Sequence, residues 1–130
     1  MIVFVQLCGA LLGVLAVVLG AFGAHRLKKI LSADQLNSFE TGVRYQMYHA
    51  LLLLVLGFNL EFSSPLQLYM AWCIILGTLL FSFSIYLLCL LAAQGRKIGL
   101  LGLLTPLGGL LLVLGWALLF YFYAARLLVA

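Results

Sequence analysis

The chain has 130 residues, of which 67% are hydrophobic and only 8% charged, and its formal net charge is +4. Soluble domains carry about 25% charged residues, so the composition excludes an ordinary soluble protein. Four segments lack charged side chains entirely: residues 1–24, 45–60, 62–95 and 98–125. A membrane-spanning helix needs about 20 mostly apolar residues. We therefore predict an all-α polytopic membrane protein, with four transmembrane helices in a compact bundle that forms one domain, residues 1–130.

The first predicted helix covers residues 2–23 and has a face of small residues. Gly9, Gly13 and Gly20 recur at helical spacing on this face, and small residues there let a second helix approach closely. We expect the face to pack inside the protein's own bundle. A seam between two copies of the chain is the alternative.

The second predicted helix covers residues 33–59 and follows a basic, amphipathic turn at 25–31. Ser32 and Gln35 have the spacing of a capping box, which marks a helix start. This helix is longer than the hydrocarbon core, so its first turns should project into the cytoplasmic interface.

The third and fourth predicted helices cover residues 66–92 and 99–124. Pro106 lies inside the fourth helix, where it removes a backbone hydrogen bond and should produce a kink. Gly108 and Gly109 follow it and are expected to pack against a neighbouring helix. Aromatic residues near the outer end of the fourth helix are typical of an interfacial belt: Trp116, Tyr121 and Tyr123.

The basic residues predict the orientation of the chain. Six of them flank the first and third connections: Arg26, Lys28, Lys29, Arg44, Arg96 and Lys97. The positive-inside rule places these connections in the cytoplasm, with both termini outside, and we expect a bacterial inner membrane. Five of these residues should contact lipid headgroups: Arg26, Lys28, Lys29, Arg96 and Lys97.

Polar residues gather around the start of the second helix, and we expect them to form a pocket at its cytoplasmic end: His25, Glu40, Arg44, Tyr45, Gln46 and His49. Gln46 and His49 share a helix face, and Glu40 can pair with Arg44 at i,i+4. His49 should lie about one turn inside the cytoplasmic boundary, with His25 at a similar depth.

Three interpretations of the two histidines remain open. They are neutral and hydrogen-bonded as part of the structure, or they form a proton-sensing or small-ligand site, or they bind a transition metal with Glu40 or Cys89. Their spacing matches no compact metal motif, and we assign no metal or cofactor.

Four motifs resemble one family, the small membrane proteins grouped as domain of unknown function 423. They are GAFGAH at 20–25, F-x-TGVRYQMYHALLLL at 39–54, FSFSIYLL at 81–88 and TPLGG-x6-W at 105–116. The resemblance implies four membrane helices and no particular reaction. Phe83 departs from the family, which usually has glycine there, so a close helix contact at this position is not expected.

No catalytic set and no nucleic-acid module is recognisable in the sequence. We therefore expect a non-enzymatic structural, assembly or accessory protein of the membrane. Its partners would be lipids, a partner membrane protein or further copies of itself. The alternative is an oligomeric proton or metal-cation transporter or channel that uses the region of His25 and His49.

Overall fold

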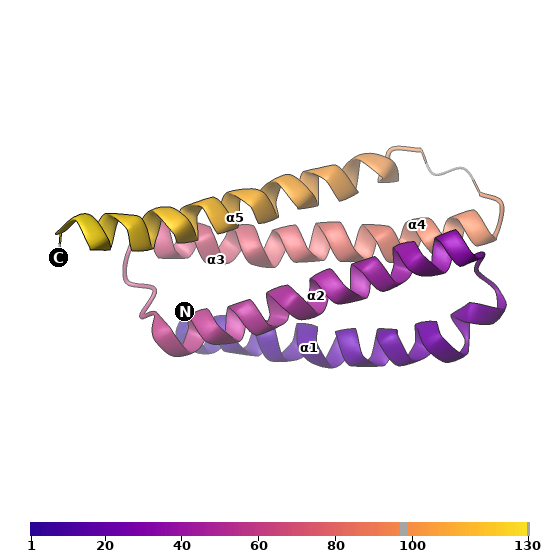
Figure 1. The fold of residues 1–130 in the computed structure, drawn as a ribbon, viewed down its shortest axis with the longest axis horizontal. Coiled ribbons are helices and arrows are strands. Elements are labelled where there is room, and N and C mark those ends of the chain that lie inside the picture. Colours follow the sequence, from indigo (N-terminus) through magenta and orange to yellow (C-terminus); the bar gives the residue numbers. More distant parts are fainter. Residues whose placement is uncertain (97–98, 130) are drawn as a thin grey trace.

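A computed structural model describes residues 1–96 and 99–129 of the chain. All regular elements in this part are helices: α1 (Ile2–His25), a 3-10 turn (Leu27–Lys29), α2 (Ala33–Asn59), α3 (Pro65–Thr78), the π-helical segment η2 (Leu79–Phe83), α4 (Ser84–Ala93) and α5 (Leu101–Val129). Segments α3, η2 and α4 follow one another without a break, so the chain forms four rods (Figure 1). The predicted all-α class is confirmed, and the four helices lie close to their predicted positions.

The starts of two rods are fixed by capping side chains. Ser32 Oγ accepts a hydrogen bond from the backbone N–H of Gln35 at 3.2 Å, and Gln35 Oε1 accepts one from the N–H of Ser32 at 2.9 Å. This capping box confirms the predicted start of α2. Ser64 and Gln67 form a second box before α3, where Pro65 occupies a first-turn position whose N–H needs no partner.

Three rods are long and apolar enough to cross a membrane by length and composition: Ile2–Lys29, Pro65–Ala93 and Leu101–Leu128. Helix α2 has 27 residues, which is also long enough at 1.5 Å per residue. Its first half, however, carries Asp34, Glu40 and Arg44. Length and composition therefore support three of the four predicted spans directly.

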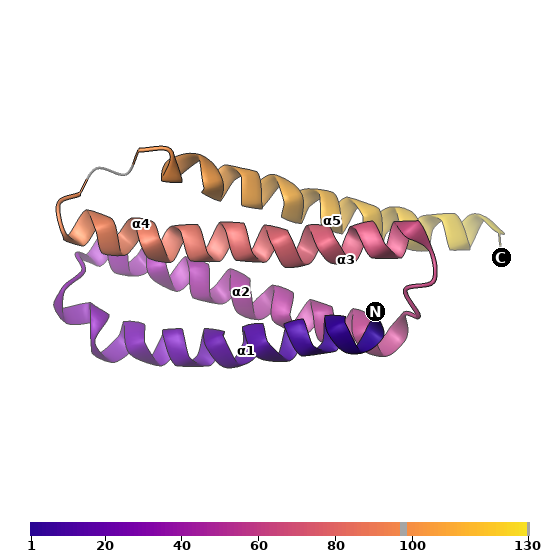
Figure 2. The ribbon, with the colours of Figure 1, turned by 180° about the vertical axis from the view of Figure 1, so that it is seen from behind.

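The rods form two antiparallel hairpins that pack against each other. Helix α1 packs on α2, α2 packs on the α3–η2–α4 rod, and that rod packs on α5. Figures 1 and 2 show α1 and α5 as the outer rods of this arrangement, with both chain termini at one end and the α1–α2 and α4–α5 connections at the other. The α5 rod diverges from α4 towards that second end (Figure 1).

Two apolar clusters fill the interior. The larger lies at the end of the termini and comprises Val5, Leu12, Ala50, Leu53, Leu56, Leu60, Phe62, Met70, Ala71, Ile74, Ile75 and Phe122. The smaller lies at the end of the connections and comprises Leu27, Leu31, Phe39, Tyr86 and Cys89. Along α2 and along the α3–η2–α4 rod, buried polar residues separate the two clusters: Gln46, His49, Thr78, Ser82 and Ser84. We call these five residues the polar layer.

Two of the five glycines expected to pack lie at close helix crossings. A Cβ on Gly9 would come within 2.9 Å of the Ala50 carbonyl oxygen, and one on Gly108 would collide with the main chain of Phe81 in η2. At Gly13, Gly20 and Gly109 a Cβ would find 3.4 Å or more to its nearest neighbour.

Candidate functional site: a buried polar layer and an adjoining groove

Gln46 ties three helices together at the centre of the molecule. Its side chain has no exposed surface. The amide Nε2 donates to the carbonyl of Leu12 in α1 at 2.8 Å, and Oε1 accepts from the hydroxyl of Tyr86 in α4, also at 2.8 Å. A buried polar group that lacks a partner is strongly destabilising, so these bonds account for a glutamine among apolar side chains.

His49 links α2 to α5. Its Nδ1 lies 2.7 Å from the carbonyl oxygen of Tyr45, and the Nε1–H of Trp116 donates to its Nε2 at 3.2 Å. A carbonyl only accepts, so Nδ1 carries the proton and Nε2 is the acceptor. This arrangement holds a neutral imidazole with both nitrogens bonded. A second proton, on Nε2, would turn this acceptor into a donor that faces the N–H donor of Trp116.

Hydroxyl groups complete the layer on the α3–η2–α4 rod. Thr78 Oγ1 donates to the carbonyl of Ile74 at 2.7 Å. Ser84 Oγ lies 2.9 Å from the Phe81 carbonyl and 2.7 Å from Thr105 Oγ1 of α5. Ser82 Oγ is buried and has no hydrogen-bond partner among the described residues. π-helical segments such as η2 are frequent at functional sites.

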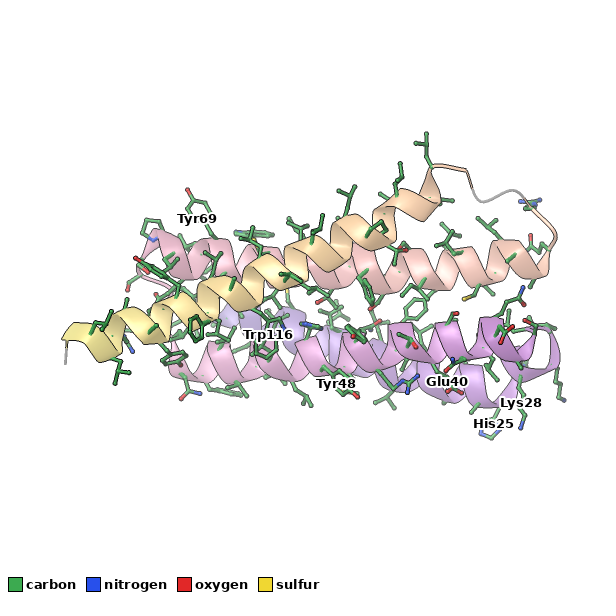
Figure 3. The ribbon with its side chains drawn as sticks, turned by 45° about the horizontal axis from the view of Figure 1, so that its top comes forward. His25, Lys28, Glu40, Tyr48, Tyr69 and Trp116 are labelled. Carbon is green, nitrogen blue, oxygen red and sulfur yellow. The ribbon has the colours of Figure 1, made fainter. Side chains whose placement is uncertain are left out.

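The structure brings together only part of the predicted pocket. Gln46 and His49 are buried, whereas His25, Glu40, Arg44 and Tyr45 are exposed. Figure 3 shows His25 beside Lys28 at the end of the connections, far along the molecule from Trp116, whose side chain bonds His49. Arg44 donates to the backbone carbonyl of Glu40 and to the Thr41 hydroxyl, and no Arg44–Glu40 carboxylate pair occurs in the described part.

His49 and Trp116 lie at one level of the molecule, near the middle of their rods. His49 is sixteen residues into α2, roughly 24 Å along the axis, and Trp116, expected in an interfacial belt, bonds to it there. The depth of either residue in the bilayer stays a prediction. His25 is exposed at the end of the connections (Figure 3), so the two histidines share no pocket. No group of three or more His, Cys, Asp or Glu side chains suited to a metal occurs among the described residues.

The basic residues expected to contact lipid headgroups flank the helix connections, and their contact with lipid stays a prediction. Arg26, Lys28, Lys29 and Arg96 are exposed; the first three follow α1, and Arg96 follows α4. Lys97, the fifth expected headgroup contact, is outside the described residues. Phe83 is 40% exposed, and its ring packs edge-on against Tyr86 of its own rod at 5.6 Å.

A groove of about 550 Å³ opens between α2 and the α4–α5 pair at the end of the connections. One wall is polar and comes from α2: Asp34, Gln35, Asn37, Ser38 and Thr41. The opposite wall is mostly apolar: Ile85, Leu88, Cys89, Ala92, Gly102 and Thr105. Its α5 residues, Gly102 and Thr105, belong to the first turns of that helix, at the end where α5 diverges from α4 (Figure 1). We call this cavity the α2–α5 groove.

Sequence reasoning missed the α2–α5 groove, although α2 carries a signal for its polar wall. Asp34, Asn37, Ser38 and Thr41 follow the i, i+3, i+4, i+7 pattern of one helix face. A polar stripe of this kind on a helix in or against a membrane requires a polar surrounding. The residues opposite the stripe come from α4 and α5, and a local sequence pattern does not predict which helices pack there.

Comparison with known sequences identifies relatives of this chain. The family model described as "Protein of unknown function (DUF423)" matches residues 19–109. The chain belongs to the DUF423 family. The matched range of the DUF423 chain includes Gln46, His49 and every residue that lines the α2–α5 groove. Trp116 lies beyond it.

Named relatives of this DUF423 protein are bacterial membrane proteins. A UPF0382 membrane protein of Staphylococcus saprophyticus is 41% identical over 111 residues, which cover 85% of this chain and 88% of the relative. The UPF0382 membrane protein YwdK of Bacillus subtilis is 40% identical over 110 residues, 83% and 85% of the two chains. The UPF0382 inner membrane protein YgdD of Escherichia coli K12 is 35% identical over 119 residues, 89% and 86%. No solved structure matches the chain. This DUF423 chain is therefore a membrane protein.

Proposed function

We propose that the protein is a non-enzymatic component of the bacterial inner membrane that binds a phospholipid in the α2–α5 groove. The observation that carries this proposal is the groove's pair of unlike walls, polar on α2 and mostly apolar on α4 and α5. A phospholipid has the same division between headgroup and acyl chain. The volume of about 550 Å³ falls within the roughly 300–1,000 Å³ of small-molecule sites.

The proposal requires α2 to be a fourth membrane span. It lies antiparallel to α1 and has nearly the same length. The buried polar groups in its middle, Gln46 and His49, are hydrogen-bonded to other helices. Polar side chains within a membrane normally face the protein interior and pair there, so these two residues are compatible with a spanning α2 in a four-helix bundle.

The polar layer fits a structural role better than a catalytic one. Gln46 bonds α1 and α4, and His49 bonds α5 through Nε2 and the Tyr45 carbonyl of its own helix through Nδ1. A group that is already fully bonded must break a bond before it acts on a ligand. The α2–α5 groove, in contrast, presents polar side chains to an open space.

Quantifying retained lipid tests the proposal. We expect wild-type protein, purified in mild detergent, to retain stoichiometric phospholipid. Ala92→Phe fills the groove and should abolish retention, because Ala92 lines it. Ala21→Phe is the matched control, since Ala21 is exposed on α1. Equal retention by both variants, or no retention by the wild type, would overturn lipid binding in this groove.

A flux assay in liposomes separates this proposal from the transporter alternative. A lipid-binding accessory protein should carry no protons or metal cations across the bilayer. The transporter alternative uses His25 and His49 together. His25 is exposed, whereas His49 is buried, so the two side chains do not form one site. Flux that His49→Ala abolishes would favour transport over an accessory role.

A further inference from the structure

The polar wall of the α2–α5 groove has a definite hydrogen-bonding character. Ser38 Oγ donates its proton to the backbone carbonyl of Asp34, and Thr41 Oγ1 donates to that of Asn37, each at 3.0 Å. A hydroxyl has one proton to donate. Neither hydroxyl keeps a proton for a ligand, so each can only accept, beside the carboxylate of Asp34. Thr41 Oγ1 already accepts one bond from Arg44 at 3.2 Å, which leaves Ser38 as the freer acceptor.

The other side of the groove adds no hydroxyl donor. Ser84 Oγ donates to the Phe81 carbonyl, so Thr105 Oγ1 donates to Ser84. Thr105 is the polar side chain that α5 contributes to the groove. Its single proton is committed to Ser84. The α5 wall therefore offers a ligand acceptor lone pairs only.

The charge of the groove agrees with its hydrogen-bonding character. Asp34 is the single charged side chain among the described residues that line it. Arg44, the basic residue of α2, lines a different groove with Glu40. Arg44 still reaches the wall through its bond to Thr41 at 3.2 Å, three residues from that end of the stripe. At Asp34, an anionic headgroup would meet a carboxylate. An ammonium group has three donors and a positive charge, and charge-assisted bonds to a carboxylate are among the stronger hydrogen bonds.

Two amide side chains provide the donors that a phosphate needs. Gln35 Oε1 accepts the capping bond from Ser32, which leaves the Nε2 group of Gln35 for other partners. Asn37 contributes a second amide to the same wall. The wall therefore combines acceptors and a negative charge, suited to an ammonium, with neutral N–H donors suited to phosphate oxygens.

From these features we infer that the α2–α5 groove selects a phospholipid with a primary ammonium headgroup, of the phosphatidylethanolamine type. The inference rests on the lipid binding proposed above. Asp34 lies in the first turn of α2, and Ile85 lies deeper along α4. The ammonium would therefore sit by Asp34 at the end of the molecule, with an acyl chain along Ile85 and Leu88. A choline headgroup carries the same charge but has no N–H donors, so it should bind more weakly.

Competition between lipids tests the inference. The full chain is reconstituted in vesicles of equal phosphatidylethanolamine, phosphatidylcholine and phosphatidylglycerol, extracted in mild detergent, and its retained lipid is identified by native mass spectrometry. We expect phosphatidylethanolamine to be enriched several-fold over both other lipids. Asp34→Asn should abolish the enrichment, and Asp34→Glu, which keeps the carboxylate, should preserve it. Glu61→Gln, an exposed acid at the opposite end, is the matched control and should behave as wild type.

The outcomes distinguish the two proposals. Retention of all three lipids in equal amounts, preference for phosphatidylglycerol, or enrichment that survives in Asp34→Asn would overturn ammonium selection while lipid binding stands. Absence of retained lipid in the wild type would overturn both. Circular dichroism and gel filtration show whether Asp34→Asn is folded. If it is not, enrichment in Asp34→Glu compared with its loss in Asp34→Ser decides the role of the carboxylate.

Discussion

His49 joins α2 to α5 through Nε2, which accepts from Trp116, while Nδ1 bonds the Tyr45 carbonyl within α2. The sequence placed His49 and Gln46 on one helix face, and both are buried. It also placed His25 beside them, but His25 is exposed. Shared spacing within α2 relates residues of one helix. It does not relate residues across the α1–α2 connection, where their relative depth depends on how the two helices pack.

Substitution of His49 tests its structural role. His49→Leu leaves the Trp116 N–H without an acceptor, and an unpaired polar group costs about 1–3 kcal/mol. We expect that decrease in the free energy of unfolding, measured by denaturant titration in detergent. Glutamine keeps a donor and an acceptor, so His49→Gln should lose less. Equal losses would contradict the hydrogen-bond explanation. So would stoichiometric metal in tag-free wild type that disappears in His49→Ala.

At the scale of elements, two helix crossings depend on glycine, because a Cβ at either position would collide with the backbone of the neighbouring helix. Helix α5 crosses the α3–η2–α4 rod where Gly108 meets the main chain of Phe81. The Ser84–Thr105 hydrogen bond lies beside this crossing. On the other side of the molecule, Gly9 brings α1 onto the backbone of α2 at Ala50 and Leu54. The sequence predicted a packing face of small residues on α1, but it could not tell which of them meet another backbone; of Gly9, Gly13 and Gly20, Gly9 does.

Leucine scanning of α1 tests this distinction. Gly9→Leu should force α1 away from α2, because a Cβ there comes within 2.9 Å of a backbone oxygen. Overpacking of this kind costs about 1–3 kcal/mol. Gly13→Leu is the matched control, since the nearest atom to its Cβ is a methyl group at 4.0 Å. We expect thermal stability in detergent to fall clearly for Gly9→Leu and little for Gly13→Leu. The reverse order would show that α1 packs through a different register.

For the whole molecule, the two chain ends lie together, opposite the connections that carry most of the basic residues (Figures 1 and 2). The positive-inside rule then predicts that the basic end is cytoplasmic. Which end faces the cytoplasm is a property of membrane insertion and stays a prediction here. The α2–α5 groove would open to the inner leaflet in this orientation.

Single cysteines determine the orientation. In a background with Cys8, Cys73 and Cys89 replaced, Ser63→Cys lies in the α2–α3 connection and Gln94→Cys lies after α4, and both positions are exposed. An impermeant thiol reagent should label Ser63→Cys in intact cells, and Gln94→Cys only after the membrane is opened. Labelling of Gln94→Cys alone from outside would reverse the topology, and labelling of both would contradict the antiparallel crossing.

The sequence by itself determined the number of rods, their class and most of their boundaries. Long uncharged segments and caps such as Ser32 act within a single helix, so local chemistry is sufficient to predict them. It also identified Gln46 and His49 as residues of one buried face. Only the tertiary structure decided their partners, because Leu12, Tyr86 and Trp116 come from three other helices.

The α2–α5 groove likewise belongs to the tertiary structure alone. Its polar stripe at Asp34, Asn37, Ser38 and Thr41 is readable in the sequence. Its opposite wall is contributed by α4 and by the first turns of α5, which only the packing of the helices brings against α2. Helix α5 approaches the main chain of η2 closely at Gly108, and it meets the groove further along, at Thr105 and Gly102. Periodicity reports which side of a helix is polar, but only packing between distant segments decides whether that side meets protein, water or a ligand.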